Sequence, residues 1–257
     1  MTDKYLLYID FLGFSELVKN NPNEIEKLYN LINSLAVHKH NAFKTIIFSD
    51  TILVYNKIDP KDQHEHEYLV MFACEFVSDL LYRLTDKDIY FRAILTYGNF
   101  KHYNLENVEC FYGQSLIDCY TKEKTIVGVG LFIDKKIQKH NLYFKTTSYD
   151  KDFDFVYLFS CLERLNNNTG GILPTTDLIV ISETDEYWAI KFELKTLKNI
   201  YYYSVNHQDP KVRSKYLQTY QFYRNRYNEL LICFESNDFK PSTINNTYNW
   251  SLKLESY

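Results

Sequence analysis

Two short apolar runs that each lead to a single aspartate constrain this chain more than any other feature. Residues 5–9 form an apolar run that ends at Asp10, and a turn containing Gly13 follows at once. Residues 45–48 form a second run, which reaches Asp50 through one serine. Runs of this length and composition are typical of buried strands. Two carboxylates presented this way can share a pair of divalent cations, and backbone N–H groups in a glycine turn can bind phosphate oxygens. The pattern therefore indicates nucleotide chemistry.

Composition excludes several other classes of protein. A chain of 257 residues with 46% apolar content can bury a substantial core. The formal net charge of −4 argues against a broad nucleic-acid-binding surface, so we expect no nucleic-acid partner. The five cysteines include no Cys-x-x-Cys pair, which disfavours a disulfide framework or a structural zinc site. No run approaches the roughly 18 apolar residues that span a bilayer, and the N-terminus does not read as a signal peptide. We expect a cytoplasmic protein without membrane association.

The order of predicted elements indicates an α+β fold. Apolar alternation and helical periodicity predict strands and helices in the order β-α-β-β-α-β-α-β. The predicted elements are a strand at 4–9, helices at 16–19 and 22–40, a hairpin at 43–55, a helix at 67–84, a strand at 89–97, a helix from 113 and a strand at 126–133. This order matches a ferredoxin-like core with an antiparallel central sheet and an added helix and strand.

The remainder of the chain carries weaker patterns. Here the predicted elements are strands at 152–159, 178–181 and 187–192, and a long tyrosine-rich, basic helix at 210–234. No linker, repeat or low-complexity block separates this segment from the rest. We therefore expect residues 1–135 to form the core and residues 136–257 to form a C-terminal elaboration that packs on it, within the same domain.

Four segments occur in an order that is specific to one enzyme family. They are Asp10-Phe11-Leu12-Gly13-Phe14-Ser15, the Ser49-Asp50 turn, the strand with Arg92 six residues before Gly98, and the segment 111–123 with its helix glycine Gly113. Over about residues 4–135 the chain resembles the catalytic domain of class III nucleotidyl cyclases, which make 3′,5′-cyclic nucleotides from nucleoside triphosphates. The collinear set is much stronger than any single motif. The resemblance implies the ferredoxin-like class III cyclase fold for the core.

The resemblance also implies roles for individual residues. Asp10 and Asp50 would bridge two divalent cations, Mn²⁺ or Mg²⁺, with the backbone carbonyl of Phe11 completing one coordination shell. Arg92 would act with the two aspartates in catalysis. Each active site would be completed across a two-fold interface, so a homodimer is expected. The residues expected to bind the nucleotide are Phe11, Leu12, Gly13, Phe14, Ser15, Ile46, Phe48, Cys110 and Tyr120.

The positions that would read the base depart from the family pattern. Purine cyclases of this family usually place polar residues where this chain has Ile46 and Cys110. Ile46, Phe48 and Asp50 alternate onto one face of a strand, so an apolar branched side chain and an aromatic ring would lie beside the cations. An adenine-reading Lys and Asp pair is absent from the sequence.

The predicted helix after Gly113 departs as well. Ile117 and Thr121 stand where the family has Asn and Arg, and Tyr120 and Glu123 belong to a different polar face. Such a divergent helix in a short chain is similar to the pyrimidine cyclases of bacterial anti-phage Pycsar systems, which make cyclic UMP or cyclic CMP. UTP is then the favoured substrate and CTP the second choice, and the product would activate a separate effector. Two alternatives stay open: an adenylate or guanylate cyclase with a divergent base pocket, and an inactive cyclase fold that binds nucleotide.

Several of these residues also have a plain structural explanation. Arg92 could equally form a salt bridge on its strand, Ile46 and Phe48 could belong to the core, and Tyr120 could lie on a solvated helix face. Residues 64–67, His-Glu-His-Glu, have two histidines only two positions apart, which does not suit a zinc site. We expect them to form a solvated helix start.

Overall fold

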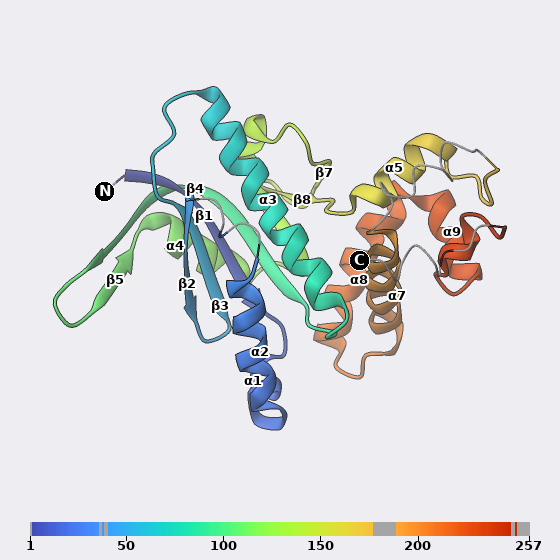
Figure 1. Ribbon diagram of the computed structural model, residues 1–257, viewed down its shortest axis with the longest axis horizontal. Coiled ribbons are helices and arrows are strands. Elements are labelled where there is room, and N and C mark those ends of the chain that lie inside the picture. Colours follow the sequence, from blue (N-terminus) through green and yellow to red (C-terminus); the bar gives the residue numbers. More distant parts are fainter. Residues whose placement is uncertain (1, 36–37, 39–40, 177–188, 248–249, 251–257) are drawn as a thin grey trace. The chain divides into compact units, whose positions relative to one another are not determined.

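The computed structural model of the chain describes residues 2–35, 38, 41–176, 189–247 and 250 (Figure 1). The chain divides into two compact units. The first comprises Met1–Leu84 and Ile89–Leu158, and the second comprises Thr85–Asp88 and Phe159–Tyr257. Residues 136–158 thus belong to the same unit as the predicted core. The expectation that the whole of 136–257 forms one domain with that core stays a prediction.

The first unit holds the strands. Its described elements are β1 (Thr2–Phe11), α1 (Phe14–Asn20), α2 (Pro22–Asn33), β2 (Phe43–Phe48), β3 (Thr51–Asn56), α3 (Gln63–Thr85), β4 (Phe91–Asn104), β5 (Glu109–Tyr112), α4 (Gln114–Glu123), β6 (Gly130–Asp134), the 3₁₀ helix η2 (Lys135–His140), β7 (Thr146–Ser148) and β8 (Phe153–Val156).

These strands form one eight-stranded sheet with the order β2-β3-β1-β4-β6-β8-β7, and β5 pairs with β4. The β4–β6 pair is parallel and the other described pairs are antiparallel. The predicted α+β class with an antiparallel-dominated central sheet is confirmed. β1 lies between β3 and β4, which places its end at the middle of the sheet (Figure 1).

Helices cover both faces of this sheet. The ring of Tyr5 contacts that of His66 on α3, with centroids 5.6 Å apart. Lys4 points to the opposite face and pairs with Gly98 of β4. A side-chain carbon on Gly98 would lie 3.6 Å from the Cβ of Ser115 on α4. α3 therefore packs on the Tyr5 face of β1 and α4 on the Lys4 face.

The start of α4 requires glycine. A Cβ atom on Gly113 would lie 2.1 Å from the carbonyl oxygen of Asn99 and 2.6 Å from the Cα of Phe100. Because backbone atoms cannot yield as a flexible side chain can, no other residue fits between the helix and β4 without displacing them. This close approach fixes the distance between α4 and the sheet.

The second unit is helical in its described part. Its elements are α5 (Ser160–Thr169), α7 (Ile190–Asn206), α8 (Pro210–Arg226), α9 (Asn228–Ser236) and the 3₁₀ helix η4 (Pro241–Thr243). Glu193 of α7 is fully buried and accepts hydrogen bonds from the N–H groups of Cys161 and Leu162, at 3.0 and 2.7 Å. Its carboxylate thus satisfies the first N–H groups of α5.

Two predicted elements of this region are corrected. The strand predicted at 187–192 is wrong for Ile190 onward, because these residues begin α7; residues 187–188, like the strand predicted at 178–181, lie outside the described residues. The hydrophobic run that suggested a strand is the buried stripe of a helix, which short apolar runs do not distinguish.

The long helix predicted at 210–234 is interrupted at Tyr227, which separates α8 from α9. Tyr227 has φ −118° and ψ 40°, its side chain is buried, and its hydroxyl donates to Glu163 at 2.7 Å. The backbone thus leaves the helical conformation at a residue whose side chain is buried and hydrogen-bonded. None of the helices in the described part of the chain combines the length and hydropathy that a bilayer crossing requires.

The helix predicted at 22–40 is shorter than expected. α2 ends at Asn33, and Ser34 caps it with a backbone hydrogen bond to Asn30. Residues 36–37 and 39–40 lie outside the described residues.

Candidate functional site

Asp10 lies near the end of β1, with Thr51 of β3 on one side and Arg92 of β4 on the other. The five residues before it are almost completely buried, so the apolar run anchors the strand and delivers a polar side chain at its end. The Asp10 side chain is 19% exposed. The carboxylate is thus close to solvent and also close to the core.

Asp50 occupies the turn between β2 and β3. Ser49, which precedes it, has φ 55°, a left-handed conformation that closes the turn. The carbonyl of Asp50 accepts the N–H of Phe11 at 3.0 Å, and the carbonyl of Ser49 accepts the Tyr29 hydroxyl at 3.0 Å. The turn is therefore tied to the residue that follows Asp10, and the two aspartates lie on adjacent backbone segments.

A third carboxylate, from Glu123 at the end of α4, reaches the same place. The guanidinium of Arg92 donates to Glu123 and, at 2.5 Å, to the carbonyl of Ile126. The same guanidinium lies 3.7 Å from a carboxylate oxygen of Asp10. Arg92 and Glu123 are 6% and 13% exposed, so this is a largely buried pair. From the sequence alone, Glu123 is expected only on a polar face of the helix.

These charges determine the protonation of Asp10. Burial, followed by the charges of Glu123 and Asp50, raises its pKa to about 7, although Arg92 acts in the opposite direction. A hydrogen bond between Glu123 and Asp10 also favours the protonated form. Of these four side chains three are acidic and one is basic, so the site has a surplus of negative charge that a cation would relieve.

The donor set is that of an oxygen-coordinated divalent cation. Carboxylates and backbone carbonyls are the ligands that Mg²⁺ and Mn²⁺ prefer. Among the described residues, no three or more His, Cys, Asp and Glu side chains are arranged so that they could hold a metal ion. A cation here would therefore depend on Asp10, Asp50 and backbone or substrate oxygens, which fits the expected set that includes the Phe11 carbonyl.

The turn after Asp10 leaves some of its N–H groups uncommitted. Phe11 donates to Asp50, and Leu12 donates to the carbonyl of Tyr90 at 2.9 Å. Gly13 has φ 73° and caps α1, and within the described residues the N–H groups of Gly13, Phe14 and Ser15 donate to no backbone carbonyl. Any phosphate contact through backbone N–H groups thus rests on these last three residues and not on Phe11 or Leu12.

The predicted base-reading residues differ in their exposure to solvent and in their distance from Asp10. Ile46 is 9% exposed, whereas Phe48, two residues further on the same face of β2, is 71% exposed. Cys110 on β5 pairs with Tyr103, which is eleven residues along β4 from Arg92 (103 against 92). At about 3.3 Å per residue this is roughly 35 Å along the strand. One chain therefore does not bring Cys110 to Asp10.

Tyr120 lies on the exposed side of α4, at 52% exposure. The ammonium of Lys124 lies 3.7 Å from the centroid of its ring. No described contact joins Tyr120 to the carboxylates.

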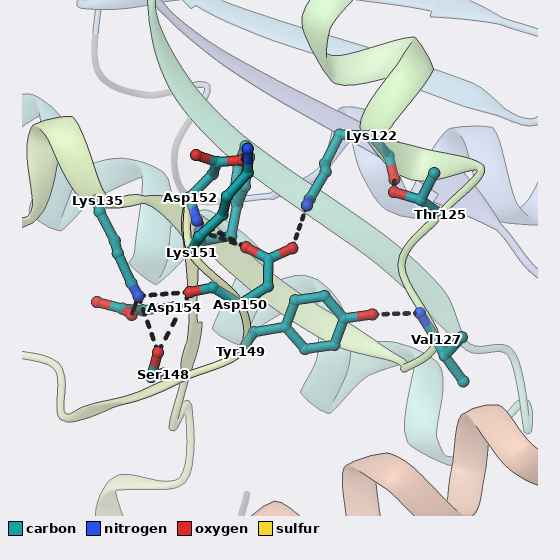
Figure 2. A network of polar contacts seen from close by, with 11 residues as sticks. Lys122, Thr125, Val127, Lys135, Ser148, Tyr149, Asp150, Lys151, Asp152 and Asp154 are labelled. Carbon is teal, nitrogen blue, oxygen red and sulfur yellow. Dashed lines mark hydrogen bonds and ion pairs between the residues drawn. The ribbon is translucent and has the colours of Figure 1, made fainter.

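A separate polar network fixes the end of α4 that carries Glu123. Figure 2 shows Lys122 of α4 paired with Asp150, which also accepts the N–H groups of Asp152 and Phe153 at 2.8 and 2.9 Å. The Tyr149 hydroxyl accepts the N–H of Val127 at 2.8 Å (Figure 2). The loop between β7 and β8 thus contacts the chain on both sides of Glu123. Lys122 therefore has a structural role, because it pairs with this loop.

Comparisons with known proteins give only distant likenesses. No protein-family model matches the chain, and no curated protein matches it. Among solved structures, it is similar to the guanylyl cyclase Cya2 (14% identity, TM-score 0.43, covering 60% of this chain and 91% of that one). It is also similar to the monomeric guanylyl cyclase domain of the RhoGC fusion protein from the aquatic fungus Blastocladiella emersonii (16%, 0.48, 60% and 94%). A third is the adenylyl cyclase CyaB from P. aeruginosa (10%, 0.45, 60% and 93%).

Proposed function

We propose that the chain is a class III nucleotidyl cyclase that depends on divalent cations. It would convert a pyrimidine nucleoside triphosphate, UTP before CTP, to the 3′,5′-cyclic monophosphate and pyrophosphate. The observation that carries this proposal is the hydrogen bond from Phe11 to the Asp50 carbonyl, which brings the backbone segments of the two aspartates together next to a glycine turn. The order of the motifs along the chain supports the same proposal.

Bound Mn²⁺ or Mg²⁺ would lower the pKa of the ribose 3′-hydroxyl and neutralise the triphosphate. Asp10, Asp50 and the Phe11 carbonyl would hold the cations. The N–H groups of Gly13, Phe14 and Ser15 would orient the phosphate oxygens. Arg92, proposed from the sequence as a catalytic residue, is held by Glu123 and Ile126; in this arrangement it orients Asp10 through charge.

The placement of the proposed base-reading residues supports a homodimer. If Ile46, Phe48 and Cys110 surround the base, Cys110 can meet Asp10 only from a second copy, because they are far apart in one chain. The exposed ring of Phe48 beside Asp50 suits contact with a ligand or with a partner copy. The product would serve as a second messenger for a separate effector in anti-phage defence, a role supported by the resemblance alone.

The substrate is tested by incubating the purified chain with each of the four nucleoside triphosphates and Mn²⁺, and identifying the products by mass. We expect cyclic UMP as the main product, and its loss on adding EDTA. Asp10→Asn and Asp50→Asn should remain folded and form no product. Asp3→Asn, the same change at the exposed start of β1, is the matched control and should retain activity.

The outcomes separate the alternatives. Cyclic AMP or cyclic GMP as the main product would favour a purine cyclase and reject the pyrimidine substrate. Nucleotide binding without product, in a folded chain supplied with Mn²⁺, would favour an inactive nucleotide-binding module. Full activity of Asp10→Asn would reject the proposed cation site.

A further inference from the structure

The turn that carries Asp50 contains a residue in an unfavourable backbone conformation. Ser49 has φ 55°, in the left-handed region that residues with a Cβ rarely adopt. The right-handed region is favoured over this one by roughly five- to thirtyfold for such a residue. The Ser49 residue is exposed, so packing of its own side chain does not hold it there. Because Asp50 follows directly, whatever holds Ser49 also sets the direction in which Asp50 leaves the turn.

A tyrosine from a separate element contacts this turn. The hydroxyl of Tyr29, on α2, donates to the carbonyl of Ser49 at 3.0 Å. That carbonyl belongs to the peptide group that joins Ser49 to Asp50, so the hydrogen bond fixes the plane of this peptide. Burial, followed by the negative charge of Asp50, raises the pKa of Tyr29, and the phenol therefore stays protonated and able to donate.

The position of the Tyr29 hydroxyl is itself determined by packing. Leu28 and Ile32 lie one helical turn apart on α2 and are 0% and 1% exposed, so they fix the rotation of the helix on the core. Tyr29 lies at the edge of this buried stripe, next to the turn between β2 and β3 (Figure 1). α2 follows α1, whose N-cap is Gly13 of the turn after Asp10. The same pair of helices is thus attached to both turns of the candidate site.

We propose that Tyr29 is a positioning residue for Asp50, whose hydroxyl holds Ser49 in the left-handed conformation. The inference rests on the proposed cation site, because a fixed Asp50 serves to bind a cation together with Asp10. Tyr29 acts here through the backbone of the turn and not by touching cation or nucleotide. The N–H of Phe11 reports on the turn, since it donates to the Asp50 carbonyl at 3.0 Å. Without the Tyr29 hydroxyl, Ser49 leaves the left-handed region more often and this hydrogen bond opens with it.

The first test is amide hydrogen exchange, measured by NMR on the full chain in EDTA. In Tyr29→Phe the Phe11 amide should exchange roughly fivefold faster than in the wild type. Amides in the middle of β1 serve as the reference for global opening. Tyr143→Phe removes a hydroxyl from a residue that is 66% exposed, and is the matched control that should leave Phe11 unchanged. Unchanged exchange of Phe11 in Tyr29→Phe, or equal acceleration throughout β1, would overturn the proposal.

The second test is rescue at Ser49 itself. Glycine adopts a positive φ as readily as a negative one, so it does not need the hydrogen bond to stay in the left-handed region. Ser49→Gly introduced into Tyr29→Phe should bring the exchange of Phe11 back to within about twofold of the wild type. Ser49→Ala in the same background keeps a Cβ and should restore nothing. Rescue by both substitutions, or by neither, would show that the hydroxyl does not act through the conformation of Ser49.

A third test follows the cation. Mn²⁺ binding to the full chain at pH 8, measured by electron paramagnetic resonance, should be weaker in Tyr29→Phe by a similar roughly fivefold factor and restored by Ser49→Gly. In the cyclase assay Tyr29→Phe should need more Mn²⁺ for its half-maximal rate but reach the wild-type kcat at saturation. A lower kcat at saturating Mn²⁺ would place Tyr29 in the chemistry and overturn the positioning role. A chain that binds Mn²⁺ but forms no product would reject the cyclase and leave this role intact, because exchange and Mn²⁺ affinity are measured without turnover. Absence of Mn²⁺ binding by the wild type would reject both.

Discussion

The guanidinium of Arg92 donates to Glu123 and lies 3.7 Å from a carboxylate oxygen of Asp10. The three side chains come from β1, α4 and β4, so this contact joins the helix to the middle of the sheet. These three side chains both connect α4 to the sheet and surround the proposed cation site.

Removing Glu123 should destabilise the fold strongly. In Glu123→Ala the largely buried Arg92 loses its closest partner, and a buried charge without compensation costs about 3 kcal/mol. Urea unfolding monitored by circular dichroism measures this loss. Glu16→Ala removes an exposed partner of Lys19 and should cause little or no change. Equal effects of the two substitutions would contradict a structural role for the Arg92–Glu123 pair.

The contribution of Asp10 to the stability of the cation-free chain should fall as the pH rises from about 4 to 7. An unfolded aspartate has a pKa of about 3.9, whereas burial and the neighbouring carboxylates raise that of Asp10 to about 7. Between these values the folded state binds the extra proton, and its advantage is lost as that proton leaves. In EDTA at pH 8, Asp10→Asn should therefore be more stable than the wild type, by about 1 kcal/mol or more. Thermal melts of both proteins at pH 4, 6 and 8 test this, and a constant difference across the series would refute it.

The two glycines near the site should respond differently to alanine. Gly113→Ala places a methyl group 2.1 Å from the Asn99 carbonyl oxygen, so α4 must move, and we expect a loss of about 3 kcal/mol. At Gly13 a methyl group would have nothing within 4 Å, and the positive φ alone should cost about 1–2 kcal/mol. Chemical unfolding ranks the two variants. A larger loss at Gly13 would show that the close approach of α4 to β4 is not limiting.

Phe48 should affect substrate choice without affecting stability. Its ring is 71% exposed, so Phe48→Ala should change the unfolding free energy by less than about 0.5 kcal/mol. If the ring shortens the base pocket, the variant should accept ATP and GTP better relative to UTP. Competition between equimolar triphosphates measures this ratio. Ile58→Ala removes a comparably exposed apolar side chain, at 69%, and should leave the ratio as it is in the wild type.

The sequence was sufficient for the elements whose patterns are local. β1, the β2–β3 hairpin and α3 were predicted because apolar alternation or a helical stripe runs through each of them. β5 was missed because four residues are too few for a periodic signal. The break at Tyr227 was missed because no local pattern marks it, and the partner of its side chain, Glu163, is 64 residues away in the chain.

Some residues of the candidate site can likewise be predicted from a local pattern, whereas others depend on packing between distant segments. Asp10 and Asp50 could be proposed from the sequence because Asp10 follows an apolar run directly and Asp50 follows one after a single serine. Glu123 could not, since its partner Arg92 is 31 residues away and the two meet only through the packing of α4 on β4. The commitment of the Leu12 N–H to Tyr90 was equally hidden, because it depends on the approach of a segment from another part of the chain.

The hydrogen bond from Phe11 to Asp50 makes the spacing of the two aspartates a property of peptide groups and not of side-chain rotamers. A turn held in this way has already lost its conformational freedom when the sheet forms. Cation binding would then order no loop, and the entropy that such ordering consumes would not be subtracted from the affinity. The two backbone segments are preorganised, and a cation bound at the proposed site would relieve the repulsion between the carboxylates that they carry.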